Sequence, residues 1–199
     1  MTSRTMTVRA QLGLLAALSC TVFVLALGGA LWQMHSGDMR LSGFVDNELA
    51  AERDVTRAYA QGLQMGQALR NILLDPANSK AYDNFDQARK DFDETLARLV
   101  DKPAYLDGGV QAAARLREIA LRWAPLQTQV IQRVKIGDAE AAKELLVGQE
   151  TPAWREMRGE LLKQLGHLEQ LAVTMRAQSA SALERGQLIV LALGVVALL

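Results

Sequence analysis

The sequence predicts an all-α fold: a membrane-anchored antiparallel four-helix bundle with up-down-up-down topology, flanked by two transmembrane helices. Hydrophobic residues make up 50% of the 199 residues, yet aromatics are only 5% and prolines number four, a composition that favours long helices. A long uncharged stretch lies near the N-terminus. Between residues 35 and 186, apolar positions recur at alternating steps of three and four, which is typical of helices packed side by side.

The N-terminal segment predicts a short cytoplasmic tail, 1–9, followed by a transmembrane helix, 10–34. That helix contains no Asp, Glu, Lys or Arg and exceeds the roughly 20 residues that span a bilayer. Arg4 and Arg9 precede it without an acidic residue, whereas acidic and basic residues are mixed after it. The positive-inside rule therefore places the N-terminus in the cytosol of a bacterial inner membrane and the following region in the periplasm.

The last residues, 187–199, are apolar after Gln187 and predict the start of a second transmembrane helix that the end of the sequence truncates. A cleaved signal peptide is the alternative for the first segment, because Gly28-Gly29-Ala30 is similar to a small-residue cleavage site. Two apolar segments on either side of one region favour an uncleaved anchor. Residues 35–186 are then the periplasmic domain.

The first helix of this domain is expected from about Ser36 to Asp75, continuous with the membrane span and stopped by Pro76. The second should begin after Asn78 or Ser79, either of which can cap it, and end at Pro103. Its apolar stripe indicates the face that packs in the core, and comprises Tyr82, Phe85, Phe92, Leu96 and Leu99.

The third helix is expected over Asp107–Ile136, closing at Gly137, with a kink or a restart at Pro125. A short helix over Asp138–Val147 follows. The fourth helix should open at Thr151-Pro152, a cap followed by proline in the first turn. The stripes of these two long helices also indicate core faces, and comprise Leu116, Ile119, Trp123, Leu126, Val130 and Val134, then Trp154, Met157, Leu161, Leu165, Leu168, Leu171 and Met175.

Little in the sequence suggests catalysis, so no enzyme activity, metal site or cofactor is expected. The formal net charge is zero, with acids and bases interspersed, which argues against nucleic-acid binding. Cys20 is the single cysteine and excludes a disulfide framework. His35 and His167 have no second ligand at helical spacing. A charged set alternates in sign and predicts a solvated helix face, and comprises Asp83, Asp86, Asp91, Asp93 and Glu94 with Lys80, Arg89, Lys90 and Arg98.

Arginines are the candidate ligand contacts, because a guanidinium binds a carboxylate through two parallel hydrogen bonds. Most must nevertheless be ordinary surface residues. The set comprises Arg53, Arg57, Arg70, Arg115, Arg117, Arg122, Arg133, Arg155 and Arg158.

Three stretches carry a family resemblance: Leu69-Arg70-Asn71-Ile72-Leu73-Leu74-Asp75-Pro76, Lys135-Ile136-Gly137-Asp138-Ala139-Glu140-Ala141-Ala142 and Thr151-Pro152-Ala153-Trp154-Arg155-Glu156-Met157-Arg158. With the flanking spans, the chain resembles the four-helix-bundle sensor region of methyl-accepting chemotaxis receptors. Related bundles also precede histidine kinases and cyclic-nucleotide enzymes.

The resemblance implies a homodimer that binds a small-molecule ligand near the membrane-distal end of the subunit interface, and the arginines make an organic anion the candidate ligand. Arg70 and Thr151 look like matches to ligand contacts, and Arg155 completes the predicted ligand-binding set. Further helix-one arginines of known amino-acid sensors fall near Gln61 and Gly66 here, which speaks against aspartate- or serine-type recognition.

The resemblance also implies signal transduction across the membrane to a missing cytoplasmic part, a HAMP linker and a methylated hairpin that reach the chemotaxis signalling proteins. Membrane lipid would surround the spans. Two alternatives stay open. The region can be the sensor of a histidine kinase or another membrane signalling enzyme, or a structural bundle that docks a periplasmic binding protein.

Overall fold

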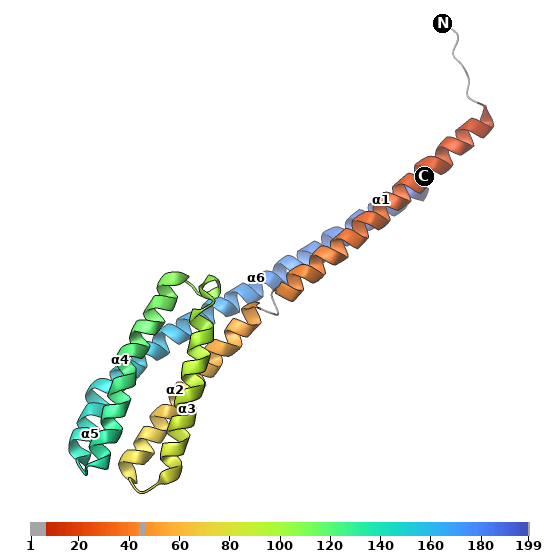
Figure 1. Ribbon diagram of the computed structural model, residues 1–199. Helices are drawn as coiled ribbons and strands as arrows, with labels where there is room; N and C mark the ends of the chain where they lie inside the picture. The colour runs from red at the N-terminus through yellow and green to blue at the C-terminus, as the bar shows by residue number, and fades with distance from the viewer. Residues whose placement is uncertain (1–6, 44–46, 199) are drawn as a thin grey trace. The chain divides into compact units, whose positions relative to one another are not determined.

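The computed structural model describes residues 7–43 and 47–198, and these residues form helices and connecting turns with no β-strand among them (Figure 1). The all-α prediction is therefore confirmed. The elements in chain order are α1 (Val8–Gly43), α2 (Leu49–Leu74), α3 (Ser79–Val100), the 3-10 turn η2 (Pro103–Tyr105), α4 (Val110–Lys135), α5 (Ala139–Leu145), the π-helical turn η3 (Leu146–Glu150) and α6 (Thr151–Leu198).

The chain divides into two compact units. Unit 1 comprises Met1–Phe44 and Val173–Leu199, and unit 2 comprises Val45–Ala172. Helix α6 contributes its first part to unit 2 and its remainder to unit 1. The predicted continuity between the membrane span and the first helix of the domain falls at residues 44–46, outside the described residues.

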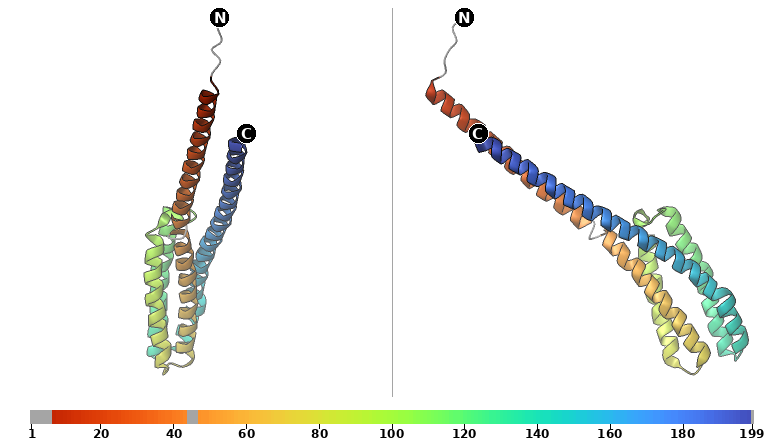
Figure 2. Two further views of the ribbon diagram at one scale, coloured as in Figure 1. Left: turned by 90° about the vertical axis from the view of Figure 1, so that its right-hand side faces the viewer. Right: turned by 180° about the vertical axis from the view of Figure 1, so that it is seen from behind.

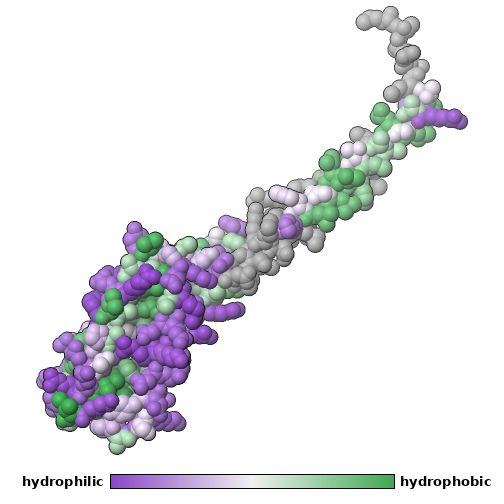
Figure 3. Space-filling view, in the orientation of Figure 1, coloured by the Kyte–Doolittle hydropathy of each residue, from purple (hydrophilic) through white to green (hydrophobic). Residues whose placement is uncertain are grey.

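Unit 1 contains the membrane candidate. The stretch Val8–Trp32 of α1 is long and apolar enough to cross a bilayer, and within the described chain it is the one stretch that meets this test. Its surface is largely hydrophobic, whereas the visible surface of unit 2 is mainly hydrophilic (Figure 3). Cys20 is exposed on this helix. A second span at 187–199 stays a prediction, as does the orientation of the chain.

In unit 2, α2, α3, α4 and the first part of α6 lie side by side (Figures 1 and 2). Helix α2 packs closely on α3, and α4 contacts both. As expected, α2 ends just before Asp75-Pro76. Asn78 caps α3, since its side chain accepts a hydrogen bond from the Ala81 N–H at 3.2 Å. At the same end of the unit, Lys135 Nζ lies 5.5 Å from the centre of the Tyr82 ring.

Most residues of the predicted stripes are buried in the core of unit 2, whereas Tyr82, Leu126, Leu165, Leu171 and Met175 are half-buried. Phe85, Phe92, Leu96 and Leu99 of α3 are buried, as are Leu116, Ile119, Trp123, Val130 and Val134 of α4 and Trp154, Met157, Leu161 and Leu168 of α6. Helix α4 runs unbroken through Pro125, so the chain does not restart there.

Aromatic rings occupy the middle of this core. Trp154 stacks on Trp123 with the ring centres 5.1 Å apart, and Phe92 meets Trp123 edge to face at 5.4 Å. The Tyr59 ring lies with its centre 6.2 Å from that of Trp154. Gly62 of α2 lies directly under the Trp154 ring, and the absence of a side chain there is what lets α2 and α6 approach.

The opening of the fourth helix differs from the prediction. Thr151 has helical backbone angles and does not cap a new helix; α5, η3 and α6 follow one another without a break. The Thr151 N–H donates to the Leu146 carbonyl, five residues back. Pro152 supplies the physical reason, because a proline inside an α-helix lacks an N–H and clashes with the carbonyl four residues earlier, and a widened π turn relieves that clash.

A buried glutamine holds the connection between α3 and α4. Gln164 of α6 is fully buried; its Oε1 accepts from the Asp107 N–H at 2.7 Å, and its Nε2 donates to the Asp107 carbonyl at 3.2 Å. The backbone of a turn is thereby satisfied by one side chain.

Candidate ligand-binding site

The three predicted ligand contacts lie on two elements. Arg70 is exposed in the last turns of α2, Thr151 is half-buried at the first position of α6, and Arg155 is exposed one turn further along α6. Unit 2 brings two of them together: Arg70 and Thr151 both act on one carboxylate, that of Glu150. The Arg155 side chain makes no hydrogen bond or ion pair with any residue in the described ranges.

The Arg70 side chain folds back along its own helix. Its Nη1 donates to the Gly66 carbonyl at 3.2 Å, and a Cβ at position 66 would lie 3.5 Å from that nitrogen. That distance is an ordinary van der Waals contact, so an alanine at 66 would also leave room for the guanidinium. An arginine has five N–H donors, so most of those on Arg70 have no protein partner among residues 7–43 and 47–198.

Glu150 is a buried acidic residue that the sequence analysis did not single out. It is only 2% exposed, yet it carries a carboxyl group. Oε1 accepts from the Trp123 indole N–H at 2.8 Å, and Oε2 accepts from the Thr151 hydroxyl at 3.3 Å. Burial raises the pKa of Glu150 above its ordinary value, while these two hydrogen bonds and the positive charge of Arg70 act to lower it.

The π turn is what directs Glu150 inward. Ala142, Leu146, Glu150 and Trp154 are all buried, at successive steps of four residues. In a regular α-helix each step of four rotates a position by about 40°, so three such steps would move it away from the core. A π turn has more residues per turn and keeps the four on one face. This spacing, together with Pro152, was the signal in the sequence that could have identified Glu150.

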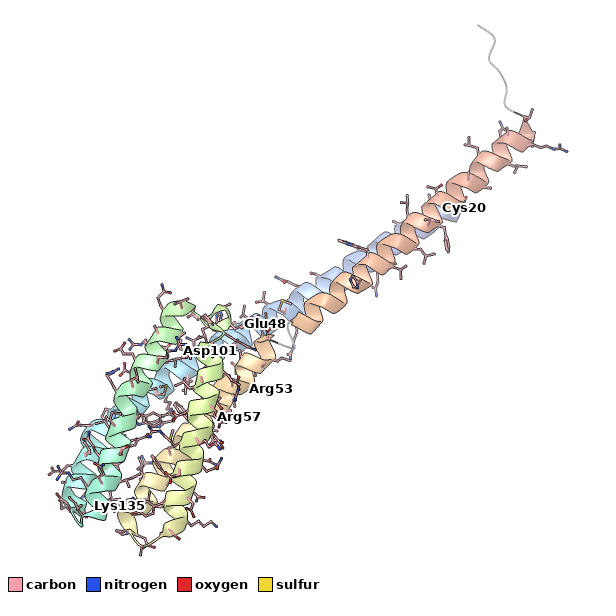
Figure 4. All side chains as sticks on the ribbon, in the orientation of Figure 1. Cys20, Glu48, Arg53, Arg57, Asp101 and Lys135 are labelled. Carbon is pink, nitrogen blue, oxygen red and sulfur yellow. The ribbon has the colours of Figure 1, made fainter. Side chains whose placement is uncertain are left out.

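The other candidate arginines separate into two groups. Arg115 and Arg122 bind Glu156 at 2.9 Å each, Arg117 binds Asp101 at 3.2 Å and Arg133 binds Asp138 at 3.3 Å. These four are surface ion pairs. In the part of the chain that the structure describes, no carboxylate lies within 4.0 Å of the others: Arg53, Arg57 (Figure 4), Arg70, Arg155 and Arg158.

Two shallow depressions lie elsewhere on the surface of unit 2. One lies along the end of α4 around Gln132, Arg133 and Ile136 and is lined by that one helix. The other, about 350 Å³, lies between α3 and α4 over Leu96, Val100 and Leu121. The lining of the first includes Lys135, whose ammonium group lies over the Tyr82 ring, and the charged side chains that line the second, Asp93, Asp101 and Arg117, are ion-paired.

Gln61 and Gly66 occupy the positions where the resemblance would place further arginines. Gly66 is buried, and the Gln61 Oε1 atom is buried without a hydrogen-bond partner among the described residues. Across the described ranges, no three His, Cys, Asp or Glu side chains are grouped so as to hold a metal ion. Comparison with protein-family models, with curated proteins and with solved structures gives no match to this chain.

Proposed function

We propose that this chain is the sensory input region of a transmembrane chemoreceptor. Unit 2 is an extracytoplasmic four-helix bundle, up-down-up-down, that binds a small organic anion, and the two apolar segments anchor it in a bacterial inner membrane. The observation that carries the proposal is the state of Arg70: among the described residues its side chain donates to a backbone carbonyl alone, and its positive charge acts on the buried Glu150 carboxyl group.

The geometry suits an anion for two reasons. A guanidinium that donates a single bond to a backbone carbonyl can still present a fork to a carboxylate. Burial also favours the neutral form of Glu150, which reduces the repulsion that a second carboxylate would meet there. Thr151 lies at the edge of the same group, where its hydroxyl donates to Glu150.

The anchor supports the same proposal. A stretch such as Val8–Trp32 places the rest of the chain at a membrane surface, where a helical unit can report on solutes outside. Helix α6 begins at the η3 turn and runs to Leu198 as one helix, so the element that carries Thr151 also reaches unit 1. A ligand that binds one arrangement of α6 more tightly than another would shift the population of the two.

Calorimetry on the full chain in detergent micelles, against a panel of carboxylates and amino acids, tests the proposal. We expect one anion to bind and Arg70→Ala to weaken it by about tenfold to a hundredfold, the loss of a charge-assisted contact. Arg133→Ala is the matched control, since Arg133 is an exposed arginine already paired with Asp138. Equal binding by wild type and Arg70→Ala would show that the site is wrong.

A silent panel would instead favour the docking alternative, in which the bundle binds a periplasmic binding protein and has no ligand of its own. Output through a histidine kinase rather than a chemotaxis receptor changes none of these results, because both receive their input from the same domain.

A further inference from the structure

The Glu150 carboxyl is unusual in having only neutral hydrogen-bond donors. Its two oxygens accept from an indole N–H and a hydroxyl, and no Lys, Arg or His nitrogen lies within 4.0 Å of it among the described residues. A carboxylate that is 2% exposed and not ion-paired is costly to keep charged. Its protonation is therefore poised to respond to the solution.

Each element around Glu150 contributes little charge. From α2, Arg70 is the charged side chain that acts on it. From α4, the neighbour is the neutral Trp123, while Arg122 is held by Glu156. On its own segment Thr151 is neutral, and the remaining charged side chains of α5 and the start of α6 are directed elsewhere: Lys143 pairs with Glu140, and Glu144 and Arg155 are exposed.

We propose that Glu150 is a proton-binding site through which this domain senses the acidity of the surrounding solution, by exchanging hydrogen bonds in the turn that opens α6. A proton from solvent adds to Oε2, the oxygen that accepts from Thr151 in the charged form. The bond between Oε2 and the Thr151 hydroxyl then reverses direction, so that the carboxylic acid donates and Thr151 Oγ1 accepts. The Trp123 indole continues to donate to Oε1, now a neutral and weaker acceptor.

The turn contains an acceptor for the displaced hydroxyl proton. In the π turn each N–H donates to the carbonyl five residues earlier, as the Thr151 N–H does to the Leu146 carbonyl. The next bond in this pattern would join Pro152 to the Val147 carbonyl, but proline has no N–H to donate. A threonine hydroxyl in a helix can donate to a carbonyl three or four residues earlier. Val147 is four residues before Thr151. When Glu150 is protonated, the Thr151 hydroxyl thus stops donating to the Glu150 carboxyl and donates to the Val147 carbonyl instead. This change takes place in the first turn of α6, the helix that reaches unit 1.

The test needs no ligand, so its outcome is separate from that of the anion-binding experiment. The chain has three tryptophans, Trp32, Trp123 and Trp154, whose indole N–H resonances can be followed by NMR in the full chain in detergent micelles, with Trp123→Phe used for assignment. From about pH 3 to about pH 8, which covers the range of a perturbed carboxyl group, we expect the Trp123 resonance to titrate with a midpoint above 4.5, the ordinary value for Glu.

Glu150→Gln should abolish that titration, and Glu144→Gln, which removes an exposed carboxyl from the preceding helix, should leave it as in wild type. A Trp123 resonance that does not move, or that moves equally in Glu150→Gln, overturns the proposal. Thr151→Val is a second test, which keeps the Glu150 carboxyl group and can be used if the Glu150→Gln protein does not fold. Because the Thr151 bond lowers the pKa of Glu150, its loss must raise the midpoint, and an unchanged midpoint also overturns the proposal.

Discussion

Replacing Gly62 by alanine tests the packing at the centre of unit 2. A Cβ at this position would overlap the Cζ3 and Cη2 atoms of the Trp154 ring. That ring cannot easily retreat, because Trp123 stacks on it at 5.1 Å and Tyr59 lies beside it. Overpacking of this kind costs about 1–3 kcal/mol, and replacing glycine by alanine in a helix returns up to about 1 kcal/mol. We expect Gly62→Ala to lower the free energy of unfolding by about 1–2 kcal/mol.

The assay is urea denaturation followed by circular dichroism, with Gly159→Ala as the matched control. Gly159 is also a glycine inside a helix, but it is exposed and nothing lies within 4 Å of a Cβ built on it. The same substitution should therefore stabilise the chain there by up to about 1 kcal/mol. Trp154→Leu removes the ring that the new Cβ would overlap, so Gly62→Ala should cost less in a Trp154→Leu background than in wild type. A Gly62→Ala protein as stable as wild type would refute the proposed close approach of α2 and α6.

Three further predictions concern polar side chains. Because the folded pKa of Glu150 is raised, its contribution to stability is present below the ordinary pKa of 4.5 and lost as the pH rises through the folded value; urea denaturation at a series of pH values should show this loss in wild type and not in Glu150→Gln. Gln164→Ala leaves the N–H and carbonyl of Asp107 without partners and should cost about 2–3 kcal/mol, with faster amide exchange at Asp107; unchanged exchange would contradict it. Glu156→Gln breaks only part-exposed ion pairs and should change the unfolding free energy by less than about 1 kcal/mol in the same assay.

The helices of unit 2 could be predicted because local chemistry decides them. Steps of three and four place Phe92, Trp123 and Leu161 on core faces whatever the neighbouring helix, and all three are buried. The stop before Pro76 and the cap at Asn78 likewise depend on residues within one turn.

The start of α6 could not be predicted in the same way. Thr151-Pro152 has the composition of a cap and a first turn, and a cap is what such a pair favours when nothing else acts on it. Here the residues on either side of this pair have distant partners: Glu150 accepts a hydrogen bond from Trp123, 27 residues earlier, and Trp154 packs on Gly62. Those contacts keep the chain helical through the proline at the cost of one widened turn. Gln164 was missed for a related reason, since a polar residue inside an apolar stripe gives no sign that its partner is a backbone turn.

Polar contacts define how far the helices of unit 2 can slide on one another. Its core contains many alanines and leucines, and such surfaces fit together in several offsets along a helix. Gln127 on α4 accepts from Arg89 of α3 at 3.0 Å, and Trp123 one turn earlier donates to Glu150. A shift of α4 by one turn, about 5.4 Å, would break both. Of these two contacts only the one at Glu150 can be weakened by a proton, because an amide does not titrate. If the turn before α6 has two arrangements, the acidity of the solution can therefore select between them at Glu150 while the Arg89 contact holds α3 and α4 in place.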